Sequence, residues 1–213
     1  MTCSSSLADD LTPLVLDTSV LINLHACSHG VRILTAIPNE IAIPDVVVRE
    51  LSHETSRTNG EHQFIQDILA QNVARAVSLD DAGWEVFGKL TTASPSLGDG
   101  EAATIALAAT SGFRPVIDDG KGRKSAAILV RESTAAWSLD LLLHPQVQAE
   151  LPNGGYVEAV YRALSEGRMR IDEARCDAVV RLIGAERALC CTSLPGFKAR
   201  REIWRRWSQT DKS

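Results

Sequence analysis

The sequence predicts an α/β fold, with a parallel β-sheet flanked by helices and followed by an all-helical C-terminal extension.

 

Two observations carry this prediction. Short apolar runs alternate with helical patterns along residues 13–144, and this alternation is typical of a parallel sheet with helices on both faces. Residues 138–207 show helical patterns alone, with breaks at 152–155, 167–171 and 194–196. We therefore expect a sheet-containing domain at residues 13–144 and a helical C-terminal extension at residues 145–213.

In the first part of the chain, each predicted strand ends beside a helix-start signal. Residues 14–16 are apolar and end at Asp17, and Thr18 opens a helical pattern. The strand at 41–43 stops at Pro44, a residue favoured in the first turn of a helix. The further elements expected here are a helix at 30–37, a helix at 44–51, a polar loop at 53–62, a helix at 62–71, a strand at 73–79 and a helix at 81–90.

The middle of the chain predicts a helix of small residues and two more strands. Residues 101–111 contain five alanines, which suit close packing on a sheet, and Gly112 ends this helix. The apolar residues 115–117 predict a strand that ends at the pair Asp118 and Asp119. A helix at 123–131 and a last strand at 134–137 complete the prediction.

Composition and charge exclude several classes of protein. Of the 213 residues, 45% are hydrophobic and 23% charged, which is typical of a soluble globular chain rather than a disordered, collagen-like or coiled-coil one. The net charge of −5 argues against a generic basic nucleic-acid binder. The charge is uneven, because residues 1–144 hold 10 Lys/Arg and 18 Asp/Glu whereas residues 145–213 hold 12 and 9. The acidic excess therefore lies in the predicted sheet domain.

The cysteines and the N-terminal residues indicate where in the cell the protein is expected to act. The five cysteines are odd in number and form no C-x-x-C pair, which argues against a disulfide scaffold and a cysteine-zinc site. The first residues lack the basic and apolar regions of a signal peptide, and no apolar stretch reaches the ~18–20 residues that span a bilayer. We expect a soluble, cytoplasmic protein with no membrane partner.

Acidic residues follow two of the predicted strands. Asp17 ends the first strand and Asp118 and Asp119 end the fourth, and ligand sites in open α/β sheets form beyond these carboxyl ends. Glu50 lies late in the helix after the second strand, and Glu101 begins the small-residue helix. Carboxylates packed together raise each other's pKa, and a divalent cation offsets their repulsion.

Oxygen ligands without cysteine or histidine favour Mg²⁺ or Mn²⁺ over zinc. A pocket that holds such ions suits phosphodiester hydrolysis, because bound metal lowers the pKa of the attacking water. Each acid also has a plainer explanation on its own. Asp17 can be a helix cap, Glu50 a solvated helix residue, and the pair before Gly120 part of a turn.

Four segments in order give the sequence a family resemblance. They are LVLDTSVLI at 14–22, PDVVVREL at 44–51, LGDGEAATIALA at 97–108 and VIDDGKGRKSA at 116–126. In content and spacing the chain resembles the PIN-domain ribonucleases, in particular the VapC-like toxins of toxin–antitoxin pairs. The match covers residues 13–144, with a looser echo at 156–171.

The resemblance implies a metal-dependent endoribonuclease. It assigns catalytic and metal-binding roles to Asp17, Glu50, Glu101, Asp118 and Asp119. Whether Asp118 or Asp119 is the closer ligand stays open, and Thr18 and Ser19 match the positions that orient the first acid. The implied cofactor is Mg²⁺ or Mn²⁺. The implied partners are an RNA substrate, a cognate antitoxin protein and a second copy in a homodimer.

The basic tail at 196–207 and residue Arg123 each leave two interpretations open. Tail arginines can neutralise RNA phosphates while Trp204 and Trp207 stack on bases, or the tail can be an amphipathic helix that docks its aromatic residues. Arg123 can contact substrate phosphate or pair with a carboxylate, and we favour the pairing.

Three other functions compete with the nuclease as explanations of the sequence. A haloacid-dehalogenase-like phosphatase needs a second Asp where this chain has Ser19. A phosphoacceptor receiver domain carries its acid pair at the first strand, whereas here the pair comes late. A PIN-fold RNA- or protein-binding module with weak or no catalysis stays open as the alternative.

Overall fold

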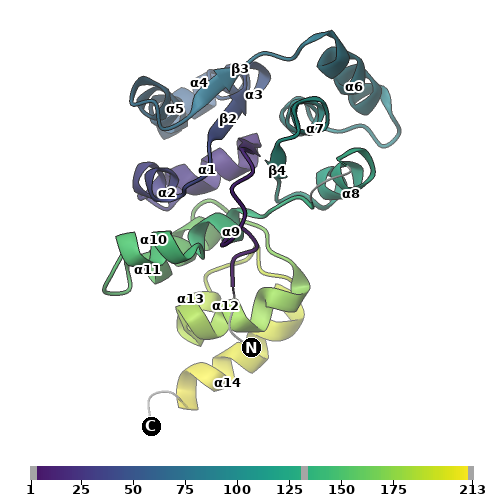
Figure 1. The fold of residues 1–213 in the computed structure, drawn as a ribbon. Helices are drawn as coiled ribbons and strands as arrows, with labels where there is room; N and C mark the ends of the chain where they lie inside the picture. The colour runs from purple at the N-terminus through teal and green to yellow at the C-terminus, as the bar shows by residue number, and fades with distance from the viewer. Residues whose placement is uncertain (1–3, 131–133, 211–213) are drawn as a thin grey trace.

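A parallel sheet of four strands lies at the centre of the upper part of the molecule in Figure 1. The computed structural model describes residues 4–130 and 134–210. The strands run in the order β3-β2-β1-β4, and every neighbouring pair is parallel. Their bounds are β1 Leu14–Leu16, β2 Ile41–Pro44, β3 Arg75–Val77 and β4 Arg114–Val116. The predicted α/β class with a parallel sheet is therefore confirmed.

Helices connect and follow the strands. Between β1 and residue 130 they are α1 Thr18–Ala26, α2 Gly30–Ala36, α3 Asp45–Glu50, α4 Glu54–Asn59, α5 Glu61–Ala70, α6 Asp81–Thr92, α7 Asp99–Ser111 and α8 Gly120–Leu129. After residue 134 they are α9 Ser138–Leu142, α10 Pro145–Glu150, α11 Gly155–Ser165, the short 3-10 helix η1 Glu173–Arg175, α12 Cys176–Ile183, α13 Ala185–Ala188 and α14 Phe197–Thr210. The predicted helical C-terminal segment is present.

Three predicted elements differ from the structure. The expected loop at 53–62 is wrong, because it contains α4 and the start of α5, which Gly60 separates with a φ of +89°. Helix α4 is polar and buries only Ser56 among its residues, so it lacks the apolar periodicity that predicts a helix. The expected strand at 134–137 is a single parallel bridge between Val116 and Ala136. Cys3 and the expected helix end at residue 131 lie outside the described residues.

Alternate residues of the strands face two apolar cores. Leu14 and Leu16 of β1 belong to the larger core, with α1, α2, α5 and the helices after α8. Val15, between them, belongs to the smaller core with α6, α7 and α8. This is the period of two that a strand imposes on its side chains. The sheet is therefore covered on both faces, as parallel sheets are.

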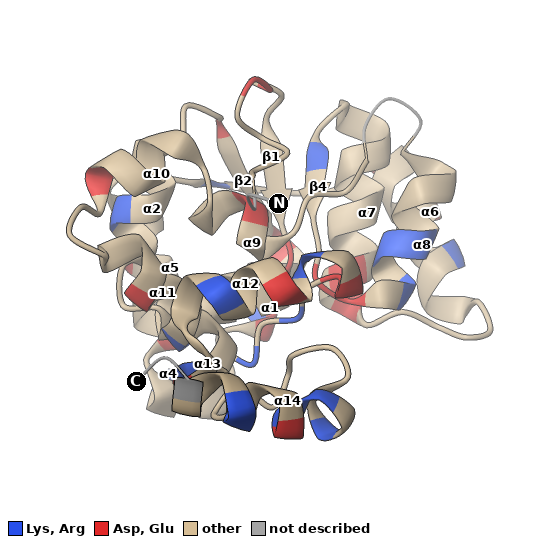
Figure 2. Cartoon of the chain, turned by 90° about the horizontal axis from the view of Figure 1, so that it is seen from below, with Lys and Arg blue, Asp and Glu red and all other residues tan. Residues whose placement is uncertain are grey.

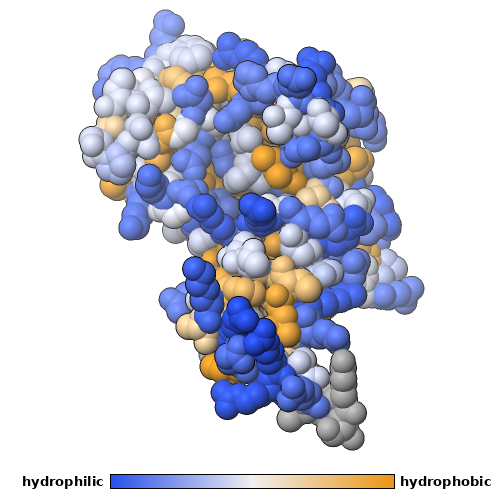
Figure 3. Space-filling view, turned by 180° about the vertical axis from the view of Figure 1, so that it is seen from behind, coloured by the Kyte–Doolittle hydropathy of each residue, from blue (hydrophilic) through white to orange (hydrophobic). Residues whose placement is uncertain are grey.

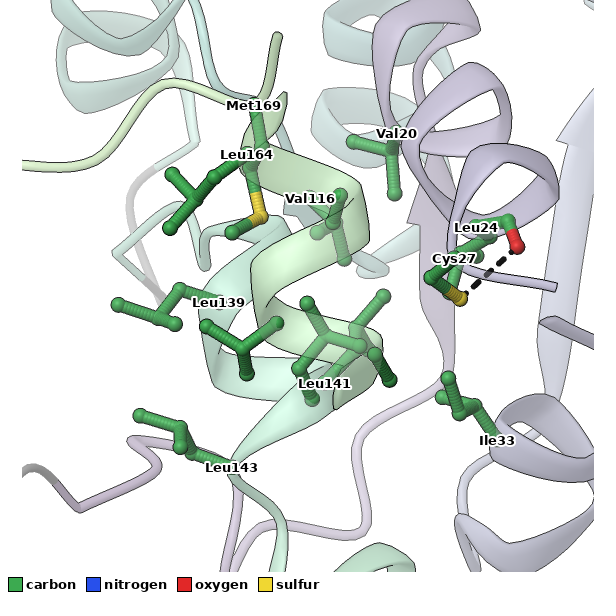
Figure 4. Close-up of a cluster of buried hydrophobic side chains, with 14 of the residues drawn as sticks. Val20, Leu24, Cys27, Ile33, Val116, Leu139, Leu141, Leu143, Leu164 and Met169 are labelled. Carbon is green, nitrogen blue, oxygen red and sulfur yellow. Dashed lines mark hydrogen bonds between the residues drawn. The ribbon is translucent and has the colours of Figure 1, made fainter. Parts of the chain in front are cut away.

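The C-terminal helices pack into the larger core. Figure 4 shows Leu164 and Met169, from the region of α11, in one cluster with Leu24 and Cys27 from the N-terminal part. Trp204 of α14 is 1% exposed and meets Phe197 edge-on, with ring centroids 5.9 Å apart. The division into domains at residue 144 stays a prediction.

The basic tail forms α14, at the end of the molecule farthest from the sheet (Figure 1). Its buried tryptophan agrees with a docked amphipathic helix and removes Trp204 as a base-stacking residue. Arg200 pairs with Glu173 and Asp177 at 3.1 and 2.9 Å. Mostly hydrophilic side chains cover this end in the view from behind (Figure 3). In the described parts of the chain, no helix combines the length and apolar character needed to cross a membrane.

The strand order fixes where a site can form. From β1 the chain moves outward through β2 to β3 and then returns to β4 on the other side of β1. The connections therefore change direction between β1 and β4, and ligands in open α/β sheets bind outside such a switch point. Asp17 directly follows β1, and Asp118 and Asp119 lie just beyond β4.

Candidate active site

Asp17 caps the N-terminus of α1 and is 2% exposed. Its Oδ2 accepts hydrogen bonds from the backbone N–H of Ser19 at 3.2 Å and from the Ser19 hydroxyl at 2.6 Å. Burial raises the pKa of the Asp17 carboxyl, and the nearby charge of Glu50 raises it further. The structure thus accounts for Asp17 as a cap and also places it beside a second acid.

Glu50 meets the first turn of α1 at the end of α3. The Thr18 hydroxyl donates to Glu50 Oε2 at 2.5 Å. Gly100 of α7 lies directly against this pair, because a Cβ added to it would stand 2.4 Å from Thr18 Oγ1 and 2.5 Å from Glu50 Oε2. A glycine is therefore needed for α7 to approach the two side chains so closely.

Glu101 follows Gly100 in the first turn of α7 and is partly buried. Burial raises the pKa of its carboxyl to about 7, and the charges of Asp17 and Asp119 contribute to the rise. A carboxyl group with this pKa exchanges its proton near neutral pH. Perturbed groups of this kind concentrate at functional sites.

Asp118 is buried and held by hydrogen bonds on both oxygens. Its Oδ2 accepts from Asn23 Nδ2 at 2.7 Å, and its Oδ1 accepts from the backbone N–H of Ser138 at 2.8 Å. Burial raises the pKa of this carboxyl to about 6, although the bonds from Ser138 oppose the rise. These contacts fix the orientation of the side chain.

Asp119 caps the N-terminus of α8 and is more exposed than Asp118. Its Oδ1 accepts from the backbone N–H of Lys121 at 2.8 Å. Its Oδ2 accepts from Arg170, which forms an ion pair with it. Asp119, which is more accessible than Asp118, therefore already has Arg170 as a cationic partner.

A pocket of about 300 Å³ is lined by three of these acids, Glu101, Asp118 and Asp119, whereas Asp17 and Glu50 do not line it. Figure 2 shows acidic ribbon segments grouped between the labels of α1 and α8, in the same part of the molecule. The pocket is lined by Ser19, Ile22, Asn23, Glu101, Asp118, Asp119, Gly167, Arg168 and Arg170. The charge of Asp17 raises the pKa of Glu101 and of Asp118, and the charge of Glu50 raises the pKa of Asp17. These charge effects link all five predicted acids to this region.

A family model described as a PIN domain matches residues 13–185. The chain belongs to the PIN-domain family. Comparison with curated proteins and with solved structures finds no match. PIN domains are generally nucleases, and so hydrolases, and they typically use divalent metal ions. The matched region extends beyond the sheet through α12, so it includes the connection that carries Arg168 and Arg170.

The donor set of this PIN domain fits a hard divalent cation by its chemistry. All five predicted acids offer oxygen, which Mg²⁺ and Mn²⁺ prefer, and burial raises the pKa of three of them. A bound cation would favour their charged forms. Across residues 4–130 and 134–210, however, no three His, Cys, Asp or Glu side chains converge closely enough to hold a metal.

The PIN site contains residues that the sequence reasoning missed. Asn23 is 3% exposed and donates to Ser138 Oγ at 3.3 Å as well as to Asp118. A polar residue inside the apolar run of α1 was the available signal. Arg168 and Arg170 lie in the predicted break at 167–171. The only signal for them in the sequence was the alternation of basic and apolar residues, which places the two arginines on the same face of the segment.

Within residues 4–130 and 134–210, Arg123 forms no ion pair with a carboxylate, so the favoured pairing is not found there. Its guanidinium donates to the backbone oxygens of Ile117, Ala135 and Ala136 at 2.6–2.9 Å. It also lies over the ring of Trp137, 3.8 Å from the centroid. The carbonyl oxygens beside β4 satisfy this half-buried cation, so Arg123 holds the strand ends together in the PIN domain.

Proposed function

We propose that this PIN domain is a metal-dependent endoribonuclease that hydrolyses RNA phosphodiester bonds. The observation that supports the proposal is the pocket lined by Glu101, Asp118 and Asp119, together with the charges of Asp17 and Glu50, which act on this region. Three of these carboxyl groups have a raised pKa, which a bound cation would reverse.

In this proposal the acids hold Mg²⁺ or Mn²⁺, which would supply charge stabilisation and an acidified water. Ser19 holds Asp17 in its orientation, and Thr18 holds Glu50. Asn23 and Ser138 do the same for Asp118. Hydrogen bonds of this kind keep carboxylates in position for a metal or substrate.

RNA cleavage in the presence and absence of metal tests the proposal. The wild-type chain should cut RNA with Mg²⁺ or Mn²⁺ and stop when EDTA is added. The Asp17→Asn variant should lose at least about 100-fold in rate while its unfolding curve shows a retained fold. Normal cleavage by that variant would overturn the assignment of the site.

We further propose that the chain is the toxin of a toxin–antitoxin pair and acts in the cytoplasm. The resemblance of its four motif segments to VapC-like toxins supports this, and it implies a cognate antitoxin protein and a homodimer. Expression of the wild-type chain should arrest growth, whereas Asp17→Asn should not. A neighbouring reading frame whose product relieves the arrest and co-purifies with the chain would identify the antitoxin.

A PIN-fold binding module with weak or no catalysis is the second candidate. The ion pair of Arg170 with Asp119 favours it, as does the lack of three converging ligands within the described ranges. Calorimetric titration separates the two candidates. Stoichiometric Mn²⁺ binding supports the nuclease, and lack of binding supports the module.

A further inference from the structure

The connection between α11 and η1 runs past the acidic pocket, and we call residues 166–171 the pocket strap. Met169 and Ile171 of the strap are 0% and 5% exposed, whereas Arg168 and Arg170 are exposed. Apolar and basic residues therefore alternate along it. Both arginines line the pocket that contains Asp118 and Asp119.

The strap is fixed to the body of the protein on each side of Arg168. A Cβ added to Gly167 would stand 2.7 Å from Asn23 Oδ1 and 2.8 Å from the backbone oxygen of Ala163. The backbone N–H of Met169 donates to that same Ala163 oxygen at 2.9 Å. Arg170 therefore extends from an anchored backbone, and its position over the pocket follows from the fold.

Arg170 and Asp119 join the strap to the start of α8. Arg170 Nη1 donates to Asp119 Oδ2, while Asp119 Oδ1 is engaged by the backbone N–H of Lys121. Both oxygens of the more accessible acid are thus in use. The Arg170 side chain is 64% exposed, so it can leave the carboxylate without opening the core.

We propose that the guanidinium group of Arg170 competes with a divalent metal ion for the Asp119 carboxylate. A guanidinium in contact with Oδ2 occupies a coordination position and its charge repels a metal at that distance. The exposed ion pair contributes little to stability, so sufficient metal displaces it. This inference rests on the proposed metal-dependent function.

Mn²⁺ binding to the full chain, measured by calorimetry at about 0.15 M salt, tests the competition. The Arg170→Gln variant should bind Mn²⁺ about tenfold more tightly than the wild type, because it loses both the contact and the charge. Arg168→Gln is the matched control. It removes an equal charge from the same strap and pocket, but Arg168 has no hydrogen bond or ion pair with the described residues, so affinity should rise less than about threefold.

Equal increases in the two variants would assign the effect to net charge and overturn direct competition. An unchanged or weaker affinity in Arg170→Gln would overturn it as well. The Asp17→Asn variant separates this inference from the proposed function. If the wild type binds Mn²⁺ and Asp17→Asn does not, a failure of Arg170→Gln rejects the competition alone. If neither the wild type nor Arg170→Gln binds Mn²⁺, both proposals fail.

Discussion

Thr18 donates its hydroxyl hydrogen to Glu50 Oε2 at 2.5 Å, and this contact joins the first turn of α1 to the last residue of α3. The two residues follow different strands of the sheet. The contact holds Glu50 beside Asp17, whose pKa is raised by burial and by the charge of Glu50. One hydrogen bond therefore brings two of the motif segments to the same end of the sheet.

Gly100→Ala should disturb this pair of residues. The added Cβ would stand under 3 Å from both Thr18 Oγ1 and Glu50 Oε2, so α7 or the pair must shift. We expect a loss of about 1–3 kcal/mol in the free energy of unfolding, measured by denaturant titration. Gly88→Ala in α6 is the control, because its Cβ meets nothing within 4 Å. That variant should gain up to about 1 kcal/mol from helix propensity.

Asn23→Ala should weaken metal binding through Asp118. The variant removes the Nδ2 donor that holds Asp118 Oδ2, and a change of this kind typically lowers metal affinity about 10–100-fold. It also leaves a buried acceptor short of one partner, at a cost of about 1–3 kcal/mol in unfolding free energy. Calorimetry with Mn²⁺ and a denaturation curve measure the two effects. Unchanged affinity in a destabilised variant would confine Asn23 to a structural role.

The stability of the metal-free protein should depend on Glu101 between pH 4.5 and 7. The pKa of this carboxyl is raised to about 7 in the folded state from an ordinary 4.5, chiefly by burial. In that window the folded chain binds more protons than the unfolded chain, so the contribution of Glu101 to stability falls as pH rises. The Glu101→Gln variant should therefore gain stability relative to the wild type from pH 4.5 to 7. A difference independent of pH would show that the pKa of Glu101 is ordinary.

Trp204→Ala should detach α14 from the larger core. The side chain is 1% exposed, and truncation of a buried tryptophan costs about 3–5 kcal/mol. Ile203→Ala, at a neighbouring position that is 39% exposed, should change the unfolding free energy by less than about 0.5 kcal/mol. Equal effects of the two substitutions would mean that the tail does not dock through Trp204.

The strands and the acids that follow them could be predicted because their signals are local. An apolar run that ends at Asp17 or Asp118 is visible in the sequence, and the parallel sheet follows from the alternation of strands and helices. Helix α4 was missed because its residues are polar and almost wholly outside the core. Its boundary depends on the left-handed backbone of Gly60, which no hydrophobic period reveals.

The contacts within the site could not be predicted, because they join residues far apart in the chain. Asn23 and Asp118 are 95 positions apart, and Asp119 and Arg170 are 51 apart. Arg123 showed that residue type alone misleads, since its acceptors are backbone oxygens that only the fold brings together. The roles of the five acids as metal ligands and catalytic groups stay predictions.

The most direct test of the central claim is the rate of RNA cleavage with Mn²⁺ in a matched pair of variants on α7. Glu101→Gln and Asp99→Asn remove the same charge from the same helical turn, but Glu101 lines the pocket and Asp99 is exposed. We predict that Glu101→Gln loses at least about 100-fold in rate and that Asp99→Asn stays within about twofold of the wild type. Equal rates in Glu101→Gln and the wild type would contradict the claim that these carboxylates form the active site.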